Sequence, residues 1–310
     1  MEGRALRGAV ITGATSMIGA ALTSLLLERG VRVTALVHPG SKKRGNLPAE
    51  HPMLTIVEAG LEDLKDLEPQ SGADAFFHLA WSGTYGDARN DYDLQLKNVA
   101  YTLDAVRLAE RYGCTVFVGA GSQAEYGKPK DVLAPDSPVN PETGYGIAKL
   151  AAGQMSRGEC HKYGMAQVWT RFFSVYGPGD NAYTMVMSGI NQMLDGKRPA
   201  YTAGDQLWDY LYCRDAAKAM LLCAEYGTDG SVYCVGSGKV RPLAEYIEAI
   251  RAAVGPQAQA GLGERPYFPG QVMHLQADIS TLTRDTGFVP ETDFEEGIRR
   301  TVAWAKEQRK

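Results

Sequence analysis

Short β-branched segments alternate with helical patterns through the first half of the chain, and this alternation restricts the fold more than any other feature. The sequence predicts strands at 9–11, 31–37, 54–57, 75–79, 115–118 and 167–173. Apolar residues at helical spacing predict helices at 17–29, 92–112 and 145–163. Strands separated by helices are typical of a parallel sheet with both faces covered.

The pattern changes after Gly177-Pro178-Gly179, where short strands and Pro/Gly-rich loops separate the helices expected at 183–195, 215–226, 243–254 and 293–308. We interpret this part as a smaller α/β lobe over the carboxyl ends of the sheet, where open α/β folds bind ligands. The sequence therefore predicts a doubly wound, Rossmann-type parallel sheet in residues 1–175, to which some later segments return. Residues 176–310 are expected to form mainly a substrate-binding lobe.

Charge and cysteine content exclude several classes of protein. The formal net charge of -4 and the pI near 5.8 give no sign of a nucleic-acid surface. No segment approaches the roughly 18 apolar residues of a membrane span, and the first residues do not resemble a signal peptide. The five cysteines are scattered without a Cys-x-x-Cys pair. We therefore expect a cytoplasmic protein with reduced thiols, no metal site, and no nucleic-acid or membrane partner.

A glycine-containing loop, Thr-Gly-Ala-Thr-Ser-Met-Ile-Gly, joins the first strand to the first helix. The first glycine permits a tight turn, and the last allows the helix to pack closely on the strand. Free N–H groups at the helix N-terminus can bind a pyrophosphate. A plain glycine turn is the alternative, but the position in the chain favours a dinucleotide site. We assign this site to Gly13, Thr15, Ser16, Met17, Ile18 and Gly19.

The end of the second strand bears on the choice of dinucleotide. NAD-binding proteins usually have an acid there that binds the ribose 2′-OH. This chain has Val37-His38 instead, and Lys42-Lys43-Arg44 follows shortly. The missing carboxylate and the nearby cations favour NADP(H) over NAD(H), with His38 and Lys42 at the nucleotide. An ordinary solvated loop is the alternative interpretation of the basic residues.

Tyr145 and Lys149 lie four residues apart, which places them one above the other on a helix face. A free tyrosine, with a pKa of about 10, is a poor base near neutrality, but a nearby ammonium group favours the phenolate. Such a phenol can give a proton to a carbonyl oxygen as hydride arrives, or take one from an alcohol. Ser122, after the strand at 115–118, is predicted to hydrogen-bond the same oxygen.

These motifs resemble the extended short-chain dehydrogenase/reductase family, which contains nucleotide-sugar epimerases, dehydratases and ketoreductases. The resemblance covers nearly the whole chain, through segments 12–19, 78–80, 98–99, 121–127, 145–149, 171–179, 208–212 and 295–304. It implies catalysis by Ser122, Tyr145 and Lys149. It also implies that the dinucleotide contacts Tyr145, Lys149, Leu61, Ala80, Asn98 and Phe173.

One departure from the family pattern concerns the reaction. The 4,6-dehydratases of the family carry an acid two residues before the tyrosine of the Tyr-Gly pair, and here that position is Ala124. Glu125 comes one residue later, and strand alternation would turn it to the opposite face. We therefore expect Glu125 to be a surface residue and do not expect a 4,6-dehydratase.

Other departures concern the substrate. Trp208 and Phe268 replace two arginines with which the family holds a diphosphate, Ser174 replaces an asparagine, and Gly60 replaces an acid near the adenine. Possible substitutes for the lost arginines are Arg171, Arg198, Arg214, Arg241 and Arg265. The expected substrate contacts are Ser122, Gln123, Ser174, Trp208 and Phe268.

The leading hypothesis is an NADP(H)-dependent reductase that acts on the C4 keto group of a nucleotide-linked deoxysugar. An NAD-dependent nucleotide-sugar 4-epimerase would use the same three catalytic residues, and a reductase of non-sugar carbonyls is a further alternative. The intact catalytic set disfavours a non-catalytic dinucleotide sensor. The resemblance also implies a homodimer through the helices at 92–112 and 145–163.

Overall fold

A central sheet of seven parallel strands organises the computed structural model, which describes residues 3–128 and 131–310. The strand order is β10-β6-β5-β4-β1-β2-β3, and every pair in it is parallel. The strands are β1 (Gly8–Thr12), β2 (Arg32–Val37), β3 (Leu54–Glu58), β4 (Ala75–His78), β5 (Val116–Ser122), β6 (Ala166–Phe172) and β10 (Ser231–Val235). The order reverses between β1 and β4, which is where such sheets open a crevice for ligands.

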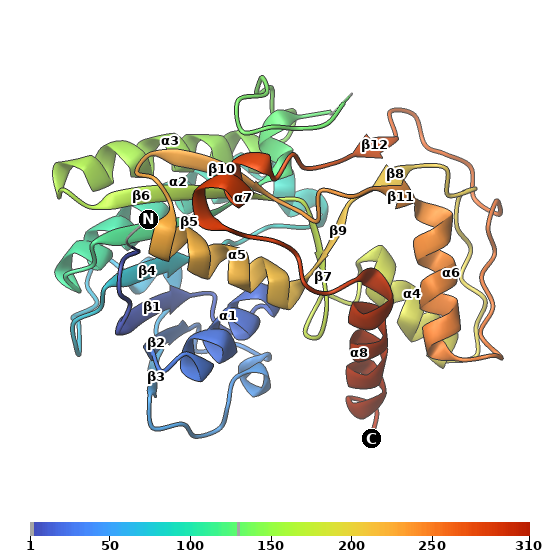
Figure 1. The fold of residues 1–310 in the computed structure, drawn as a ribbon, viewed down its shortest axis with the longest axis horizontal. Coiled ribbons are helices and arrows are strands. Elements are labelled where there is room, and N and C mark those ends of the chain that lie inside the picture. Colours follow the sequence, from blue (N-terminus) through green and yellow to red (C-terminus); the bar gives the residue numbers. More distant parts are fainter. Residues whose placement is uncertain (1–2, 129–130) are drawn as a thin grey trace.

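Helices cover both faces of this sheet (Figure 1). One face carries α1 (Met17–Glu28), α5 (Cys213–Tyr226) and α7 (Ser280–Thr286), and the other carries α2 (Tyr92–Arg111) and α3 (Gly144–Lys162). Neighbouring residues of β1 belong to different cores, since Ile11 packs with α1 and Val10 packs with α2. Strands buried on both faces explain the nearly continuous apolar segments of the sequence.

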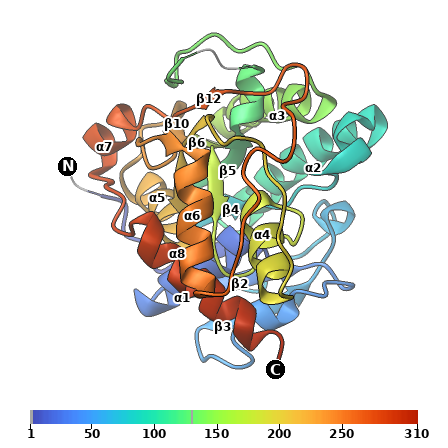
Figure 2. The ribbon, with the colours of Figure 1, turned by 90° about the vertical axis from the view of Figure 1, so that its right-hand side faces the viewer.

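A smaller lobe stands at the carboxyl ends of the strands, and Figure 2 shows it from its outer side. Its helices are α4 (Met185–Leu194), α6 (Leu243–Val254) and α8 (Phe294–Glu307). Short strands complete it, namely β7 (Ser174–Tyr176), β8 (Leu207–Trp208), β9 (Tyr210–Tyr212), β11 (Arg241–Pro242) and β12 (His274–Leu275). The ring of Phe294 lies 4.7 Å from that of Tyr176 and 4.6 Å from that of Tyr246, so α8, β7 and α6 meet in an aromatic core.

The predicted fold class is confirmed, and most predicted helices and strands end within two residues of the observed bounds. β5 is longer than expected and reaches Ser122, and α7 was not predicted. β10 pairs with β6, so a late segment does return to the large sheet. The division of the chain near residue 175 stays a prediction. In residues 3–128 and 131–310, the structure contains no helix long and apolar enough to span a membrane.

Candidate active site

The largest group of predicted site residues meets in one cavity of about 560 Å³, which we call the main pocket. It lies between the carboxyl ends of β5 and β6 and the smaller lobe. Ser122, Tyr145 and Lys149 line it together, although they come from β5 and α3. Further predicted residues in its wall are Ser16, Met17, Ile18, Gln123, Phe173, Ser174 and Trp208.

A second cavity of about 360 Å³, the glycine-loop pocket, adjoins the carboxyl ends of β1 to β4. Its lining includes the predicted residues Gly13, Thr15, Ser16, His38, Leu61 and Ala80. Gly13 has a φ of 68°, and a Cβ there would lie 2.8 Å from the Ala80 nitrogen, so glycine is required. A Cβ at Gly19 would collide with the Gly13 carbonyl.

The start of α1 fits a pyrophosphate. The Ser16 hydroxyl caps this helix by accepting a hydrogen bond from the Gly19 nitrogen at 3.1 Å. The first N–H groups of a helix have no acceptor within it, so those of Met17 and Ile18 are suited to an anion at this point. The close approach of Gly13 to Ala80 and the amides of α1 together match the shape and charge of a dinucleotide phosphate.

Besides Gly19, whose close packing against Gly13 is described above, three predicted contacts are absent from the linings of both pockets. Asn98 is buried, and its amide donates to the Ser82 and Leu94 carbonyls and accepts from the Ser82 nitrogen, so it fixes the loop after β4. Lys42 is exposed and lines a separate cavity beside α1 and α8. Phe268 is 63% exposed on the loop before β12. Their roles in binding stay predictions.

Tyr145 occupies the first turn of α3, which Thr143 caps by accepting a hydrogen bond from the Gly146 nitrogen. Burial raises the pKa of Tyr145, whereas the hydrogen bond with Ser122 and the charge of Arg89 lower it. Burial therefore favours the neutral phenol, whereas these two contacts favour the phenolate. Such a balance suits a group that must both give and take a proton.

Lys149 lies one turn further along α3, and its ammonium group is enclosed. Its Nζ donates a hydrogen bond to the Ala120 carbonyl at 2.5 Å and lies 3.8 Å from the ring centroid of Trp81. Burial lowers the pKa of Lys149 to about 7, although the charge of Glu125 raises it. Burial, together with the charge of Lys149, also lowers the pKa of nearby His78 to about 3, so His78 is neutral.

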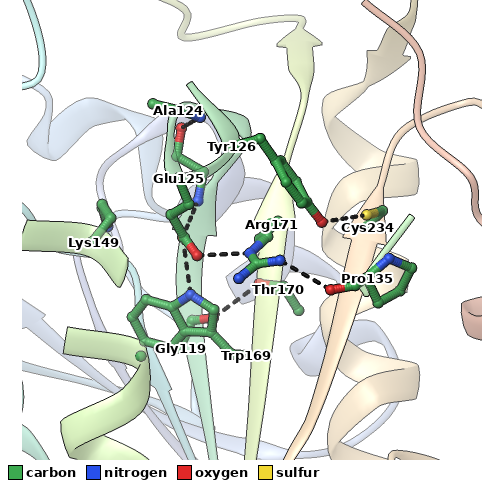
Figure 3. Close-up of polar contacts among 12 residues, drawn as sticks. Gly119, Ala124, Glu125, Tyr126, Pro135, Lys149, Trp169, Thr170, Arg171 and Cys234 are labelled. Carbon is green, nitrogen blue, oxygen red and sulfur yellow. Dashed lines mark hydrogen bonds and ion pairs between the residues drawn. The ribbon is translucent and has the colours of Figure 1, made fainter. Parts of the chain in front are cut away.

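Glu125 is not the surface residue that strand alternation predicted. It is fully buried, and Figure 3 shows its carboxylate between Trp169 and Arg171. The carboxylate accepts hydrogen bonds from the Ser122 nitrogen (2.8 Å), the Trp169 indole (3.0 Å) and the Arg171 Nε (2.7 Å). β5 ends at Ser122 and the chain turns into the short 3-10 helix η4 (Gln123–Tyr126), so strand alternation does not extend to this residue.

The arginines suggested as substitutes for the lost diphosphate contacts have other partners. Arg171, Arg198, Arg214 and Arg241 form ion pairs with Glu125, Glu264, Glu28 and Glu295. None of these four arginines is among the described residues that line the main pocket, and neither is Arg265. Trp208 does reach the pocket and donates from its indole to the Ser174 hydroxyl at 2.7 Å.

Sequence reasoning missed two residues that contact Tyr145 and Lys149. Trp81 packs edge-on to Tyr145, with ring centroids 6.0 Å apart, and covers Lys149. Arg89, from the short 3-10 helix η3 (Gly86–Asn90), places its guanidinium carbon 4.4 Å from the centroid of the Tyr145 ring. Trp81 directly follows the His-Leu-Ala motif and could have been found from that position. Arg89 lies in a loop with no motif of its own.

Lys43, from the basic segment 42–44, lines the glycine-loop pocket and is also bonded to a distant turn. Its Nζ donates to the Gly179 carbonyl (3.1 Å) and to the Asn181 side-chain oxygen (2.9 Å). Asn46, from the same loop, donates to the Thr15 carbonyl at 2.9 Å. The segment 41–47 therefore forms a strap that is bonded both to the glycine loop and to the turn before α4. In the part of the chain that the structure describes, no group of His, Cys, Asp and Glu is arranged to hold a metal ion.

Comparison with known families identifies the class of this protein. The model of the NAD dependent epimerase/dehydratase family matches residues 9–236. The chain belongs to that family. It is thus an enzyme of the extended short-chain dehydrogenase/reductase type, as the motifs indicated, and the glycine loop and the Tyr145/Lys149 pair both lie within the matched region.

Relatives of this family member match it over nearly its full length. A putative UDP-glucose 4-epimerase of Methanocaldococcus jannaschii is 26% identical over 96% of this chain and 98% of its own length. The structure of a UDP-N-acetylglucosamine 4-epimerase from Methanobrevibacter ruminantium M1 is 26% identical, with a TM-score of 0.87 over 97% of this chain and 99% of that one. The protein MoeE5, solved with UDP-glucuronic acid and NAD, is 25% identical, with a TM-score of 0.82 over the same shares.

Proposed function

We propose that this protein is an NAD-dependent 4-epimerase of nucleotide-linked sugars. The observation that carries the proposal is the convergence of Ser122, Tyr145 and Lys149 in one pocket beside a dinucleotide-binding loop. The relatives described as 4-epimerases, and the NAD in the MoeE5 structure, support this function over the reductase that we favoured from the sequence.

A bound NAD would supply the hydride acceptor and donor. In our proposal Tyr145 takes the proton of the C4 hydroxyl as that carbon is oxidised, and Ser122 holds the same oxygen by a hydrogen bond. After the keto sugar has turned its other face toward the cofactor, Tyr145 returns the proton to the oxygen as C4 is reduced. The three residues act twice, so the reaction needs no further acid.

The residues beside Ser122, Tyr145 and Lys149 support a reaction that oxidises and reduces the sugar without eliminating water. Elimination of water would need another positioned acid–base group, and position 124 is an alanine. The adjacent carboxylate of Glu125 is buried and already accepts three hydrogen bonds, one of them from Arg171. A carboxylate held in this way is not free to exchange protons with a substrate, which argues against a dehydratase.

The strap formed by residues 41–47 supports a cofactor that stays bound through both half-reactions. Lys43 bonds the strap to the turn at 179–181, and Asn46 bonds it to the glycine loop.

The charge of the glycine-loop pocket bears on the choice of cofactor. Two charged side chains, Lys43 and Glu62, line this pocket, and their charges are of opposite sign. A pocket with little net charge has no strong preference for an additional 2′-phosphate, which favours NAD.

A reductase remains the second candidate because of one observation. His38, at the end of β2, lines the glycine-loop pocket where an acid would repel a 2′-phosphate, and its ring accepts a hydrogen bond from the Gly40 nitrogen. Such a position is compatible with NADP(H). A reductase must exchange its cofactor after each turnover, so nucleotide retention separates the two candidates.

The deciding experiment is to denature the purified protein and identify the nucleotide that it releases. Retained NAD, followed by interconversion of UDP-glucose or UDP-N-acetylglucosamine with its C4 epimer without added cofactor, is the expected result. Protein that arrives empty and binds NADPH more tightly than NADH would overturn the proposal in favour of the reductase.

Tyr145→Phe is the matched variant for the same assay. The change removes one hydroxyl and leaves the ring in its contacts with Trp81 and Arg89. We expect a loss of turnover of about 100-fold or more, with NAD still retained. Full activity in this variant would show that the proposed proton transfer is wrong.

A further inference from the structure

The Tyr145 ring has a permanent cation on its face. The guanidinium carbon of Arg89 lies 4.4 Å from the ring centroid, within the range of a cation–π contact. Its Nη1 donates a hydrogen bond to the Thr84 carbonyl at 3.0 Å, which holds the group in this position. Arg89 is partly buried and lines the main pocket, so its charge is less screened than that of a surface arginine.

The lysine of the catalytic pair is placed differently. The Lys149 ammonium lies 5.9 Å from the Tyr145 ring centroid, farther than the Arg89 guanidinium, and it bonds to the Ala120 carbonyl and packs on Trp81. Because burial lowers the pKa of Lys149 to about 7, its charge depends on pH near neutrality. An arginine keeps its proton in this range.

Charged and titratable groups face Tyr145 from the surrounding elements. Arg89 and Tyr85 approach it from the segment that ends in η3, Glu125 from η4, and Lys149 from α3 itself. The negative charge of Glu125 opposes formation of a phenolate, but Glu125 is paired with Arg171 at 2.7 Å. Arg89 therefore supplies the closest unvarying positive charge to the phenol.

We propose that Arg89 is a positioning residue for the acid–base step, which holds the Tyr145 ring in place and stabilises the phenolate that forms when the phenol gives up its proton. The inference rests on the proposed function of Tyr145. Arg89 is then a second cation beside Tyr145, in addition to the Lys149 of the sequence motif. A guanidinium on the ring face assists the phenolate whether or not Lys149 is charged.

The test is the titration of Tyr145 in NAD-loaded protein, followed by NMR of tyrosine labelled with carbon-13 at Cζ. The signal that Tyr145→Phe removes identifies the residue, and no substrate is needed. We expect Arg89→Met to move this titration upward by about one pH unit, with the acid limb of kcat/KM moving in the same direction. Arg89→Lys keeps a positive charge, so its upward shift should be smaller than that of Arg89→Met.

Lys97→Gln is the control, because Lys97 is an exposed lysine of α2 and its loss removes the same unit of charge. It should leave the Tyr145 titration unchanged. If Arg89→Met fails to fold, Arg89→Gln takes its place in the same measurement. A titration that Arg89→Met or Arg89→Gln leaves at the wild-type position would overturn the inference. Failure of the proposed function would show separately, as an active Tyr145→Phe variant.

Discussion

Single residues in this protein have effects that depend on burial rather than on charge alone. Glu125 and Arg171 form an ion pair next to the main pocket, and their side chains are 0% and 6% exposed. Every oxygen of Glu125 has a donor, and the Arg171 guanidinium also donates to the Pro135 carbonyl at 3.1 Å (Figure 3). Because the pair joins the end of β5 to β6, it fixes the backbone from which Ser122 projects.

Glu125→Ala is predicted to lower the free energy of unfolding by about 3–5 kcal/mol, because it leaves the Arg171 charge buried without its carboxylate. Urea unfolding measures the change. Glu142→Ala is the control, since the Glu142–Lys128 pair is exposed and its loss should cost at most about 1 kcal/mol.

A loss below about 1 kcal/mol for Glu125→Ala would contradict the importance of burial in this pair. The double variant Glu125→Leu/Arg171→Met gives a second check. Replacing both charges by apolar groups of similar size should recover much of the stability, because no buried charge is then left without a partner.

At the scale of an element, the turn that leads into α4 contains a largely buried carboxyl group, that of Asp180. Asp180 accepts hydrogen bonds from the Asn181 nitrogen (2.7 Å) and the Thr184 hydroxyl (2.8 Å), and Thr184 in turn caps α4. Burial raises the pKa of Asp180 to about 6, although these hydrogen bonds and the charge of Lys43 lower it. The acid therefore connects the strap, the turn and the helix start.

This shift predicts how stability changes with pH. Folded Asp180 keeps its proton up to about pH 6, whereas the unfolded carboxyl loses it near pH 3.9. The wild-type protein therefore loses stability from this group as the pH rises through that window. Asp180→Asn has no such proton. Its free energy of unfolding should therefore rise relative to that of wild type by about 2 kcal/mol across the window, a value discounted for partial exposure, and then level off.

Thermal or urea unfolding of both proteins at several pH values measures this difference. The comparison between Asp180→Asn and wild type cancels the other titrating groups, so the slope belongs to this carboxyl. A difference that stays constant from pH 4 to pH 7 would show that Asp180 ionises normally in the folded protein.

At the scale of the whole molecule, the outer surface of α2 and α3 bears on assembly. Tyr92 and Leu96 of α2 and Ile147 and Met155 of α3 are at least half exposed. The two helices pack against each other on one face of the sheet (Figure 1). We propose that this surface forms the homodimer contact expected from the sequence, because a two-fold contact would cover the same apolar residues in both copies.

Leu96→Asp is predicted to weaken this dimer at least about 10-fold, because a charge would be buried at the contact. Sedimentation of the variant and the wild type over a range of concentrations measures the change. Val289→Asp is the control, since Val289 is also exposed but lies between α7 and α8. Equal masses for Leu96→Asp and wild type would place the contact elsewhere or exclude a dimer.

The sequence by itself determined the fold class, and it predicted which residues would meet in the main pocket. Alternating strands and helices, the glycine loop and the Tyr145/Lys149 spacing are local patterns, and local patterns are set by the periodicity of helices and strands and by glycine conformation. Ser122 could be added because it follows the strand predicted at 115–118 and because the family resemblance implies its role. These features required no knowledge of distant contacts.

Tertiary structure alone decided the surroundings of that set. The burial of Glu125 depends on Trp169 and Arg171 in the next strand, and the cation over Tyr145 comes from a loop more than fifty residues earlier. Lys43 is bonded to a turn 136 residues away, and its place in the chain does not reveal that connection. The energy of a charge depends on its neighbours in space and on their exclusion of water, and a sequence pattern contains neither.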